Sequence, residues 1–306
     1  MGDAKEISKH AFAGLDHLES LEIEAYEGWD VIHPETFSDL SSLRKLEINY
    51  PNFEYLPTDL FRNLGFLEEL KLYRVKLREW NAETFAPLIN LKSLVVENYT
   101  SQMPIGGHTI PEGLLRSMTH LQTLSFTVGR VKHSTLPTNL LSGLTQLKYI
   151  DLGGNHIKSL DESFFKDQAR LEKLILWFND FYSIEAMSLK PLISIQELDL
   201  SNNKILSIFR RDFKTFSMLK KIDLSNIELY LLPERVFKNN PLMEEVNLRA
   251  NKLLRNEDIE DHALAGLVHL KVLDLSSNYP DSKGPISISR IGISRFVTVL
   301  GAEIRP

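Results

Sequence analysis

A nine-residue pattern, L-x-x-L-x-L-x-x-N with other apolar residues sometimes in the leucine positions, recurs eleven times in this chain. The most regular copies begin at Leu147, Leu171, Ile195, Met243 and Leu270. Less regular copies begin at Leu18, Leu43, Leu67, Leu91, Leu121 and Leu219. The period is 24 residues where nothing is inserted. Such a period predicts a solenoid, because one unit cannot bury its apolar face without neighbours on both sides.

Within each copy, the alternation of apolar and polar residues predicts a short strand whose positions four and six are buried. These strands are expected to stack as a parallel sheet on the concave face. Asparagine at position nine can bond backbone groups of the turn that leaves the strand, which the turn cannot satisfy alone. The structural asparagines of this kind are Asn155, Asn179, Asn203, Asn251 and Asn278. An apolar spine behind the strands is expected from Phe12, Phe37, Phe61, Phe85, Phe165, Phe213 and Phe237.

The composition is ordinary for a globular protein, with 43% apolar and 25% charged residues among 306. The net charge of −6 gives no electrostatic case for a nucleic-acid partner or an acidic membrane surface. No apolar run is long enough to span a bilayer, and the first residues contain no apolar signal core. The chain has no cysteine. This absence suits an oxidising compartment, where a free thiol is a liability, and indicates a secretory origin.

No arrangement of residues predicts catalysis, a cofactor or a metal. The nine histidines share no metal-ligand spacing, and there is no phosphate-binding glycine loop, nucleophile elbow or paired-carboxylate site. An aspartate recurs at position five, but it belongs to an L-D-L variant of the pattern and is not interpreted as a metal ligand. These aspartates are Asp151, Asp199, Asp223 and Asp274. The expected function is therefore non-covalent binding.

The ends of the chain depart from the pattern. Residues 1–17 have the spacing of the back half of a repeat, and the eleven copies occupy residues 18–278. Residues 279–306 begin with a turn-rich break and continue without the repeat spacing, either as a cap strand or as an unrelated remnant. We expect a fragment, isoform or incomplete gene model of a longer receptor, because a solenoid normally needs capping elements. The alternative is a complete protein with atypical ends.

Two adjacent aromatic residues stand on the concave wall, which is expected to face solvent. The alternation places Trp177 on this wall and Phe178 beside the following turn. Gly153 and Gly154 on the preceding strand leave space, and Tyr149 is close by. Aromatic anchors beside a gap are typical of binding hot spots. The alternative is that Trp177 packs over the glycines as a plug.

A second candidate patch lies on the wall further towards the N-terminus. It consists of Tyr50, Lys71, Tyr73 and Arg74, from two consecutive repeats. Aromatic and arginine side chains are enriched at protein interfaces. Exposed aromatic residues are also common on ordinary surfaces, which is the alternative interpretation of this patch.

The insertions between repeats all follow position nine, on one flank. The largest lies between Tyr99 and Ile110 and contains Met103 and His108, which are candidate binding residues. Insertions gathered on one face often mark a binding face. The alternative is that this flank tolerates growth, because loop closure costs little. Asn98, in the one N-x-Ser/Thr sequence, is a candidate glycosylation site beside this insertion.

The second half of the repeat carries a more specific resemblance. The stretches L-P-x-x-x-F-x-x-L from Leu56 and L-P-x-x-x-F from Leu232 resemble the "typical" animal extracellular leucine-rich repeat over roughly residues 7–278. Position nine departs from asparagine in six copies, which makes the array resemble Toll-like receptor ectodomains more than regular matrix proteoglycans. The residues in question are Tyr26, Pro51, Val75, Tyr99, Gly129 and Ile227.

This resemblance implies an α/β solenoid of horseshoe form and a non-catalytic binding module of a receptor. The expected ligand is a protein or another macromolecule, bound on the concave face and the insertion flank. The resemblance also implies an extracellular or cell-surface location, membrane attachment only through segments outside this chain, and room for a receptor dimer. The alternative is an intracellular adaptor or substrate-recruiting scaffold that uses the same solenoid in the cytoplasm.

Overall fold

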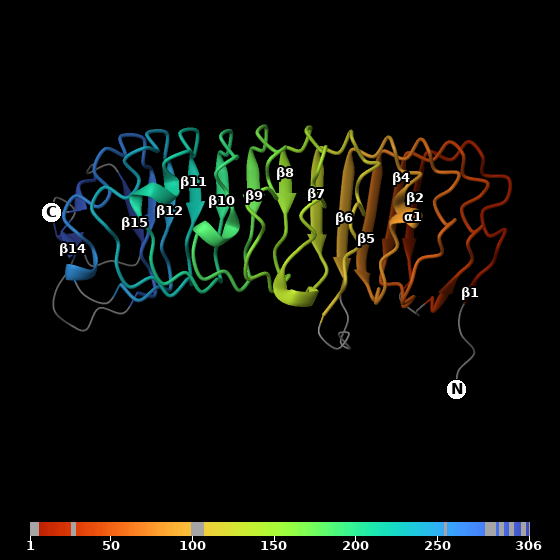
Figure 1. Cartoon of the computed structure of the whole chain (residues 1–306), viewed down its shortest axis with the longest axis horizontal. Coiled ribbons are helices and arrows are strands. Elements are labelled where there is room, and N and C mark those ends of the chain that lie inside the picture. The colour runs from red at the N-terminus through yellow and green to blue at the C-terminus, as the bar shows by residue number, and fades with distance from the viewer. Residues whose placement is uncertain are drawn as a thin grey trace. The chain divides into compact units, whose positions relative to one another are not determined.

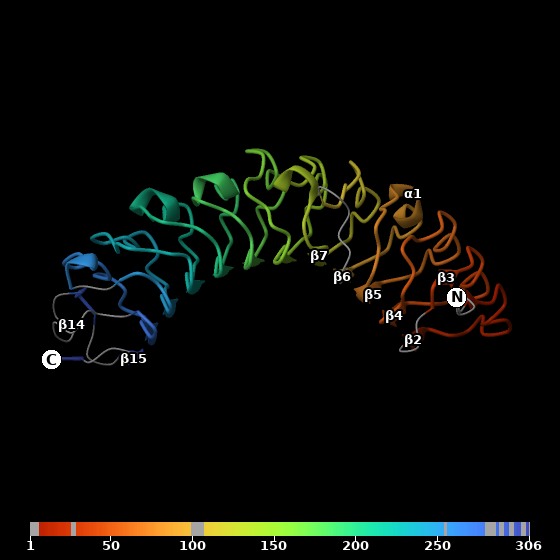
Figure 2. The same ribbon diagram turned by 90° about the horizontal axis from the view of Figure 1, so that it is seen from below.

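The computed structural model describes residues 6–25, 29–98, 107–253, 256–278, 286–287, 291–293, 297–300 and 304–305. The chain forms two compact units. Unit 1 contains residues 1–157 and 163–168, and unit 2 contains residues 158–162 and 169–306. In each unit the strands line the inner side of an arc and short helical turns lie on its outer side (Figures 1 and 2). Among the described residues, no helix is long and apolar enough to cross a membrane.

The sheet of unit 1 is parallel and follows the order of the sequence. Its strands are β2 (Ser20–Glu24), β4 (Lys45–Asn49), β5 (Glu69–Val75), β6 (Ser93–Asn98), β7 (Thr123–Thr127) and β8 (Tyr149–Asp151). A second, two-stranded pair joins β1 (Glu6–Ile7) to β3 (Val31–Ile32). The outer side carries the helix α1 (Ala82–Phe85) and the 3-10 turn η1 (Lys132–Ser134).

The sheet of unit 2 is also parallel and sequential. Its strands are β9 (Lys173–Ile175), β10 (Glu197–Asp199), β11 (Lys221–Asp223), β12 (Glu245–Asn247), β13 (Val272–Asp274) and β15 (Thr298–Leu300). The 3-10 turns are η2 (Glu185–Met187), η3 (Arg210–Phe213) and η4 (Asn256–Asp258), and a short pair joins β14 (Ile286–Ser287) to β16 (Ile304–Arg305). β15 continues the ladder beyond the last copy of the pattern, since Val299 pairs with Leu273.

Each of the eleven copies of the pattern contains one strand, so the predicted repeat solenoid with a parallel sheet is confirmed. Equivalent positions pair across neighbouring strands, as Leu198 does with Leu174 on one side and Ile222 on the other. All three side chains are buried. A register shifted by one residue would turn these leucines to solvent, so the apolar period determines the pairing.

The apolar core of each unit lies behind its strands. Predicted spine residues stack in neighbouring turns, with ring centroids 5.9 Å apart for Phe61 and Phe85 and 5.0 Å apart for Phe213 and Phe237. These four rings are at most 1% exposed. The first spine residue, Phe12, stacks on the next at 5.8 Å but is only half-buried.

The position-nine asparagines link neighbouring turns through buried hydrogen bonds. Nδ2 of Asn203 donates to the Leu176 carbonyl and the Leu200 carbonyl, both at 2.9 Å, and Oδ1 accepts from the Phe181 amide at 3.2 Å. Asn155 also forms three such bonds within unit 1: its Nδ2 donates to the Phe126 and Leu152 carbonyls, and its Oδ1 accepts from the Val128 amide. One side chain thus satisfies backbone groups of two turns that no strand can reach.

The backbone conformation at position eight determines whether the side chain there faces solvent or the interior. In eight copies this residue has a left-handed backbone, and its side chain is not fully buried. These residues are Tyr50, Arg74, Gly154, Phe178, Asn202, Asn226, Ala250 and Ser277. In the other three copies Ala25, Asn98 and Val128 lack the left-handed turn and are buried. Position eight therefore faces the interior in these three copies.

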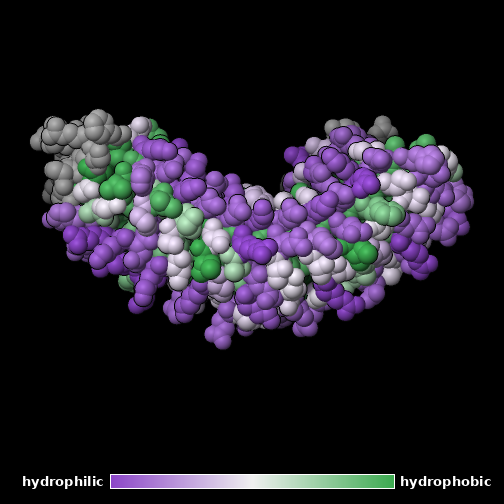
Figure 3. Space-filling model, turned by 90° about the horizontal axis from the view of Figure 1, so that it is seen from above, coloured by the Kyte–Doolittle hydropathy of each residue, from purple (hydrophilic) through white to green (hydrophobic). Residues whose placement is uncertain are grey.

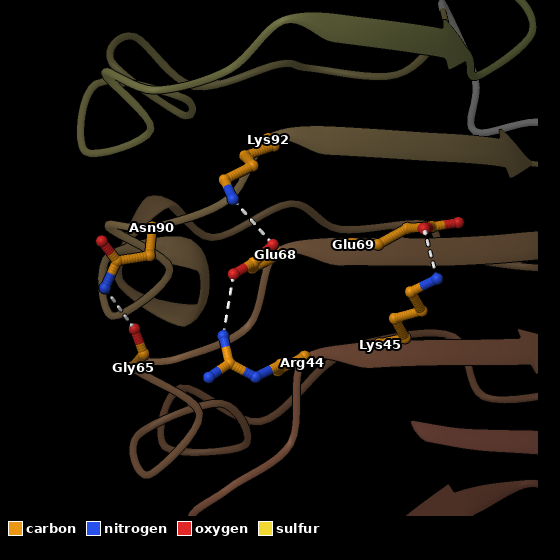
Figure 4. A network of polar contacts seen from close by, with 7 residues as sticks. All are labelled: Arg44, Lys45, Gly65, Glu68, Glu69, Asn90 and Lys92. Carbon is orange, nitrogen blue, oxygen red and sulfur yellow. Dashed lines mark hydrogen bonds and ion pairs between the residues drawn. The ribbon is translucent and has the colours of Figure 1, made fainter. Parts of the chain in front are cut away.

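The edge at which the strands begin is mostly hydrophilic, with separate apolar spots (Figure 3). Ion pairs join neighbouring turns along this edge in unit 1 (Figure 4). Glu68 accepts from Arg44 at 2.9 Å and from Lys92 at 2.7 Å, and Lys45 lies 4.0 Å from the carboxylate of Glu69. The hydrogen bond from Lys92 is the main cause that lowers the pKa of Glu68. These contacts are exposed, so each contributes little to stability.

Candidate functional site

The structure brings the four residues of the predicted unit 1 patch together on β4, β5 and the turns that follow them. The Arg74 guanidinium lies 5.1 Å from the centre of the Tyr50 ring, a cation–π distance. The Tyr50 amide donates to the carbonyl of Tyr73 at 3.0 Å. Arg74 is exposed, and the two tyrosines are half-buried. The patch therefore presents the guanidinium of Arg74 next to the aromatic rings of two tyrosines.

Lys71 is the member of this patch least available to a ligand. Its ammonium lies 2.5 Å from Glu69 and 3.6 Å from Glu47. The hydrogen bond to Glu69 is the main cause that raises the pKa of Lys71. Burial raises the pKa of the neighbouring Tyr73, so its hydroxyl stays protonated at neutral pH. Arg74 lies 3.9 Å from one carboxylate, that of Glu97, but its side chain is 57% exposed, so Arg74 is the better candidate for contact with a partner.

Trp177 and Phe178 form the second predicted patch, directly after β9 in unit 2. Their ring centroids are 5.8 Å apart, and the two side chains are 40% and 50% exposed. Phe178 occupies position eight with φ of 50°. A bulky side chain in the left-handed region costs roughly 1 kcal/mol or more relative to glycine. The pair is thus an exposed aromatic surface held at a local conformational cost.

The remaining members of this prediction lie in unit 1. Tyr149 is half-buried in β8, where it pairs with Thr123 of β7. Gly153 is buried, and Gly154 has φ of 70°, which explains glycine at that position without reference to a ligand. A Cβ atom on Gly154 would approach the Thr127 methyl at 3.2 Å.

The predicted roles of Asn98 and His108 are wrong. Asn98 is 7% exposed, and its Nδ2 donates to the Leu77 carbonyl at 2.9 Å, so this amide is not presented for a glycan. Its repeat turns one residue early: Asn98 pairs with Val75, a position-nine residue, and takes the place expected for Tyr99. His108 is 1% exposed and is therefore not a binding residue. Met103 lies outside the described residues.

His108 instead anchors the return of the large insertion to the solenoid. Its backbone forms a bridge with Val131 and bonds to Arg130 and Lys132 at 2.7 Å. Gly107 approaches the same segment so closely that a Cβ atom would lie 2.6 Å from the Arg130 carbonyl oxygen. Burial lowers the pKa of His108. This residue is therefore a neutral, structural histidine at neutral pH.

The sequence did not indicate a shallow groove of about 350 Å³ on the concave face of unit 2. Alternating charges cross it, with Lys173 2.8 Å from Glu197 and Lys221 2.9 Å from Glu245. Three of the position-five aspartates, Asp199, Asp223 and Asp274, line it, and burial is the main cause that raises the pKa of Asp199. One oxygen of each aspartate accepts bonds from its own turn. Among the described residues, no three acidic or histidine side chains are grouped to hold a metal.

Comparison with known proteins identifies the repeats. Residues 169–229 match a leucine-rich repeat model, and residues 3–103 match the BspA-type leucine-rich repeat region. A curated relative, leucine-rich repeat-containing G-protein coupled receptor 5A of Xenopus laevis, is 30% identical over 151 residues. The match covers 49% of this chain and 16% of the receptor. The chain thus spans less than a fifth of this relative.

Solved structures show the same fold. TLR13 in complex with ssRNA13 matches 88% of this chain over 37% of its own length, with a TM-score of 0.70 and 24% identity. A leucine-rich repeat protein of Leptospira interrogans matches 91% of this chain over 71% of its own, at 0.66 and 22%. Toll in its Drosophila complex with Spatzle matches 96% over 45%, at 0.64 and 18%. At these identities the likeness concerns the fold alone. The RNA complex shows that the fold also accommodates a nucleic acid in another protein.

Proposed function

We propose that this leucine-rich repeat protein is a non-catalytic binding module of a Toll-like or related receptor, and that it binds a protein partner through the concave wall. The similarity to a leucine-rich repeat receptor and to Toll and TLR13 supports this class of function. The proposed location is the extracellular or cell-surface side. Leucine-rich repeat folds are typically non-catalytic binding scaffolds, which also favours this proposal.

One observation carries the proposed site. Position eight favours residues that tolerate a left-handed backbone, and Gly154, Asn202 and Asn226 meet this demand. Tyr50 and Phe178 occupy the same conformation with bulky rings, at φ of 61° and 50°. Local strain of this kind is typical of positions retained for function. The two aromatic patches are therefore the proposed contact surfaces.

A binding screen tests this proposal. The 306-residue chain, secreted and immobilised, is screened against a library of extracellular and cell-surface proteins, and each hit is measured by surface plasmon resonance. Trp177→Ala or Arg74→Ala is expected to weaken binding about thirtyfold, or by about 2 kcal/mol, if the residue is a hot spot. Lys238→Ala, which changes an exposed side chain on the outer side, is the matched control.

Surface plasmon resonance with a second probe also distinguishes a protein ligand from a nucleic-acid ligand. Single-stranded RNA is the second probe, and the net charge of −6 predicts no binding at physiological salt. The proposed binding site on the concave wall would be contradicted if both patch variants bound the protein partner as tightly as the unchanged chain does. It would also be contradicted if the chain bound RNA alone. Because Asn98 is buried, we expect no mobility shift after glycosidase treatment of the folded, secreted protein.

A further inference from the structure

The groove on the wall of unit 2 crosses the strands instead of running along them. Residues of six neighbouring strands line it, from β9 at one end to β15 at the other. Neighbouring strands of a sheet lie about 4.8 Å apart, so five intervals give a groove roughly 24 Å long. It is shallow and open, unlike the enclosed pockets that bury most of a small ligand. Its shape therefore suits side chains that project from a segment of a macromolecule.

Apolar side chains lie at both ends of the groove. Leu300 on β15 lines one end and is 45% exposed. Ile175 on β9 lines the other end, and the exposed Trp177 follows on the same face of the chain. Backbone bonding continues past β9, because the Leu176 amide donates to the Asp199 carbonyl at 2.8 Å. Since Ile175 pairs with Asp199, Trp177 lies diagonally beside Asp199, within reach of a long side chain.

The middle of the groove carries an excess of negative charge. Two lysines and five acidic residues line it. Each lysine is already paired with a glutamate of the next strand. The three acidic residues that remain are Asp199, Asp223 and Asp274. Among the described residues, no lysine, arginine or histidine lies within ion-pair distance of these three carboxylates, so the uncompensated charge of the groove lies on them.

The three carboxylates are oriented before any partner arrives. Oδ1 of Asp199 accepts from the Ser201 amide at 2.9 Å, and the turn after β13 bonds Asp274 in the same way at 2.8 Å. Asp223 is bonded at both oxygens, because its Oδ2 also accepts from Nδ2 of Asn247 at 2.8 Å. Side chains that are already ordered lose little conformational entropy on binding.

Two features of Asp199 favour a cationic partner. Burial is the main cause that raises its pKa, and the nearby carboxylate of Asp223 raises it further, against the hydrogen bonds from Ser201 and the charge of Lys173. A cation in the groove would stabilise the ionised form. The ring of Trp177 also attracts cations to its face. Arginine fits both features, because its planar guanidinium bonds a carboxylate through two N–H groups and stacks on aromatic rings.

We propose that the groove binds a basic segment of a protein partner, with arginine side chains on the three aspartates and apolar side chains on Trp177 and Leu300. This inference rests on the proposed function, because it names the chemistry of the protein that the concave wall binds. Asp199 and Asp274 are three strand intervals apart, or about 14 Å, and an extended chain advances about 13–14 Å in four residues. An extended segment laid across the strands therefore reaches both aspartates with arginines four residues apart.

A peptide titration tests the inference. The probe is a synthetic peptide of alternating arginine and serine with a leucine at each end. In the matched peptide, citrulline, which has the shape of arginine without its charge, replaces every arginine. Isothermal titration calorimetry with the 306-residue chain is expected to show that the arginine peptide binds at least about tenfold more tightly than the citrulline peptide. Equal dissociation constants for the two peptides would overturn the inference.

Two variants locate the binding in the groove. Asp199→Asn and Asp274→Asn each remove one charge and keep the oxygen that accepts from the turn. Each is expected to raise the dissociation constant of the arginine peptide about fivefold and to leave that of the citrulline peptide unchanged. Glu162→Gln, the matched control, removes the same charge at an exposed residue outside the groove. It should change the dissociation constant by less than about twofold.

Asn247→Asp is the decisive variant, because it should strengthen binding. Residue 247 occupies position five of β12, where it pairs with Asp223 on one side and Asp274 on the other. A fourth carboxylate in this row should lower the dissociation constant of the arginine peptide about threefold or more. A misfolded chain could not gain affinity. The inference is overturned if Asn247→Asp gives no gain, or if the two asparagine variants bind as tightly as the unchanged chain.

The inference and the proposed function fail separately. A screened partner that needs Trp177 but tolerates Asp199→Asn would overturn this inference and leave the proposed function intact. If no wall variant weakens a screened partner, the proposed function fails, and the peptide titration still decides whether the groove binds arginine.

Discussion

Nε2 of His108 lies 3.3 Å from Nδ2 of Asn98, and both side chains are buried in unit 1. The Asn98 amide donates one hydrogen to the Leu77 carbonyl at 2.9 Å, and its other hydrogen is shared between His108 and the Val128 carbonyl, which lies 3.5 Å away. Nε2 must then accept, so the imidazole is neutral in this contact. Protonation would place two N–H groups against each other in the interior.

This contact predicts that acid destabilises unit 1. Burial lowers the folded-state pKa of His108 below its ordinary value of 6.5. Below that value His108 binds a proton in the unfolded chain but not in the folded chain. Stability is therefore lost as pH falls from about 6.5 towards the lowered pKa. Thermal melts between pH 7.5 and pH 5, at constant ionic strength, measure the loss.

The matched variant for this prediction is His108→Gln. Its side-chain oxygen can still accept from Asn98, but it does not titrate. The variant should lose less melting temperature on acidification than the unchanged chain. Equal losses in the two proteins would show that carboxylates elsewhere control the acid sensitivity.

Asn203→Ala is predicted to destabilise unit 2 by about 3 kcal/mol, because it orphans two buried backbone groups, the Leu200 carbonyl and the Phe181 amide. The Leu176 carbonyl loses one of its two donors and keeps Asn179 at 3.0 Å. Urea unfolding measures the effect. Asn239→Ala, a half-buried asparagine on the outer side, is the control and should change stability by less than about 1 kcal/mol. A loss at position 203 no larger than in the control would contradict the role of the asparagine ladder.

The repeat period in the sequence predicted the strand of each of the eleven repeats, because only one register of strand pairing buries both leucines of every strand. It did not predict the course of the turns. Asn98, the candidate glycosylation site, is buried because its repeat turns one residue early, and Val128 is buried at the same position of the next copy. The signal was present, since position nine in these copies is Tyr99 or Gly129 and an insertion follows directly.

The groove of unit 2 and the contact between Asn98 and His108 were beyond sequence reasoning for a different reason. Both depend on contacts between side chains from separate turns. The repeat period constrains the buried positions, but it does not constrain which residues occupy the exposed positions of the wall. The ion pairs that cross the groove, such as Lys173 with Glu197, follow only from the observed register.

Phe178→Gly is predicted to leave unit 2 equally stable or to stabilise it by up to about 1 kcal/mol. Glycine adopts the left-handed conformation without strain, and the ring that is lost is half exposed. Asn202→Gly, at the same position of the next repeat, should gain less, because asparagine already tolerates this conformation. Urea unfolding of both variants decides the point. A clear loss of stability in Phe178→Gly would show that the ring packs as part of the structure.

Trp177→Ala separates a binding residue from a structural plug. The alternation that buries Leu174 and Leu176 puts Trp177 on the wall, where 40% of it is exposed. Truncation of a surface residue of this kind should lower the free energy of unfolding by no more than about 1 kcal/mol. Truncation of a tryptophan that fills a gap in the interior lowers it by about 3–5 kcal/mol. Urea unfolding of the variant distinguishes the two ranges. If the larger loss is found, Trp177 serves packing, and the Tyr50 and Arg74 patch in unit 1 becomes the stronger candidate for ligand contact.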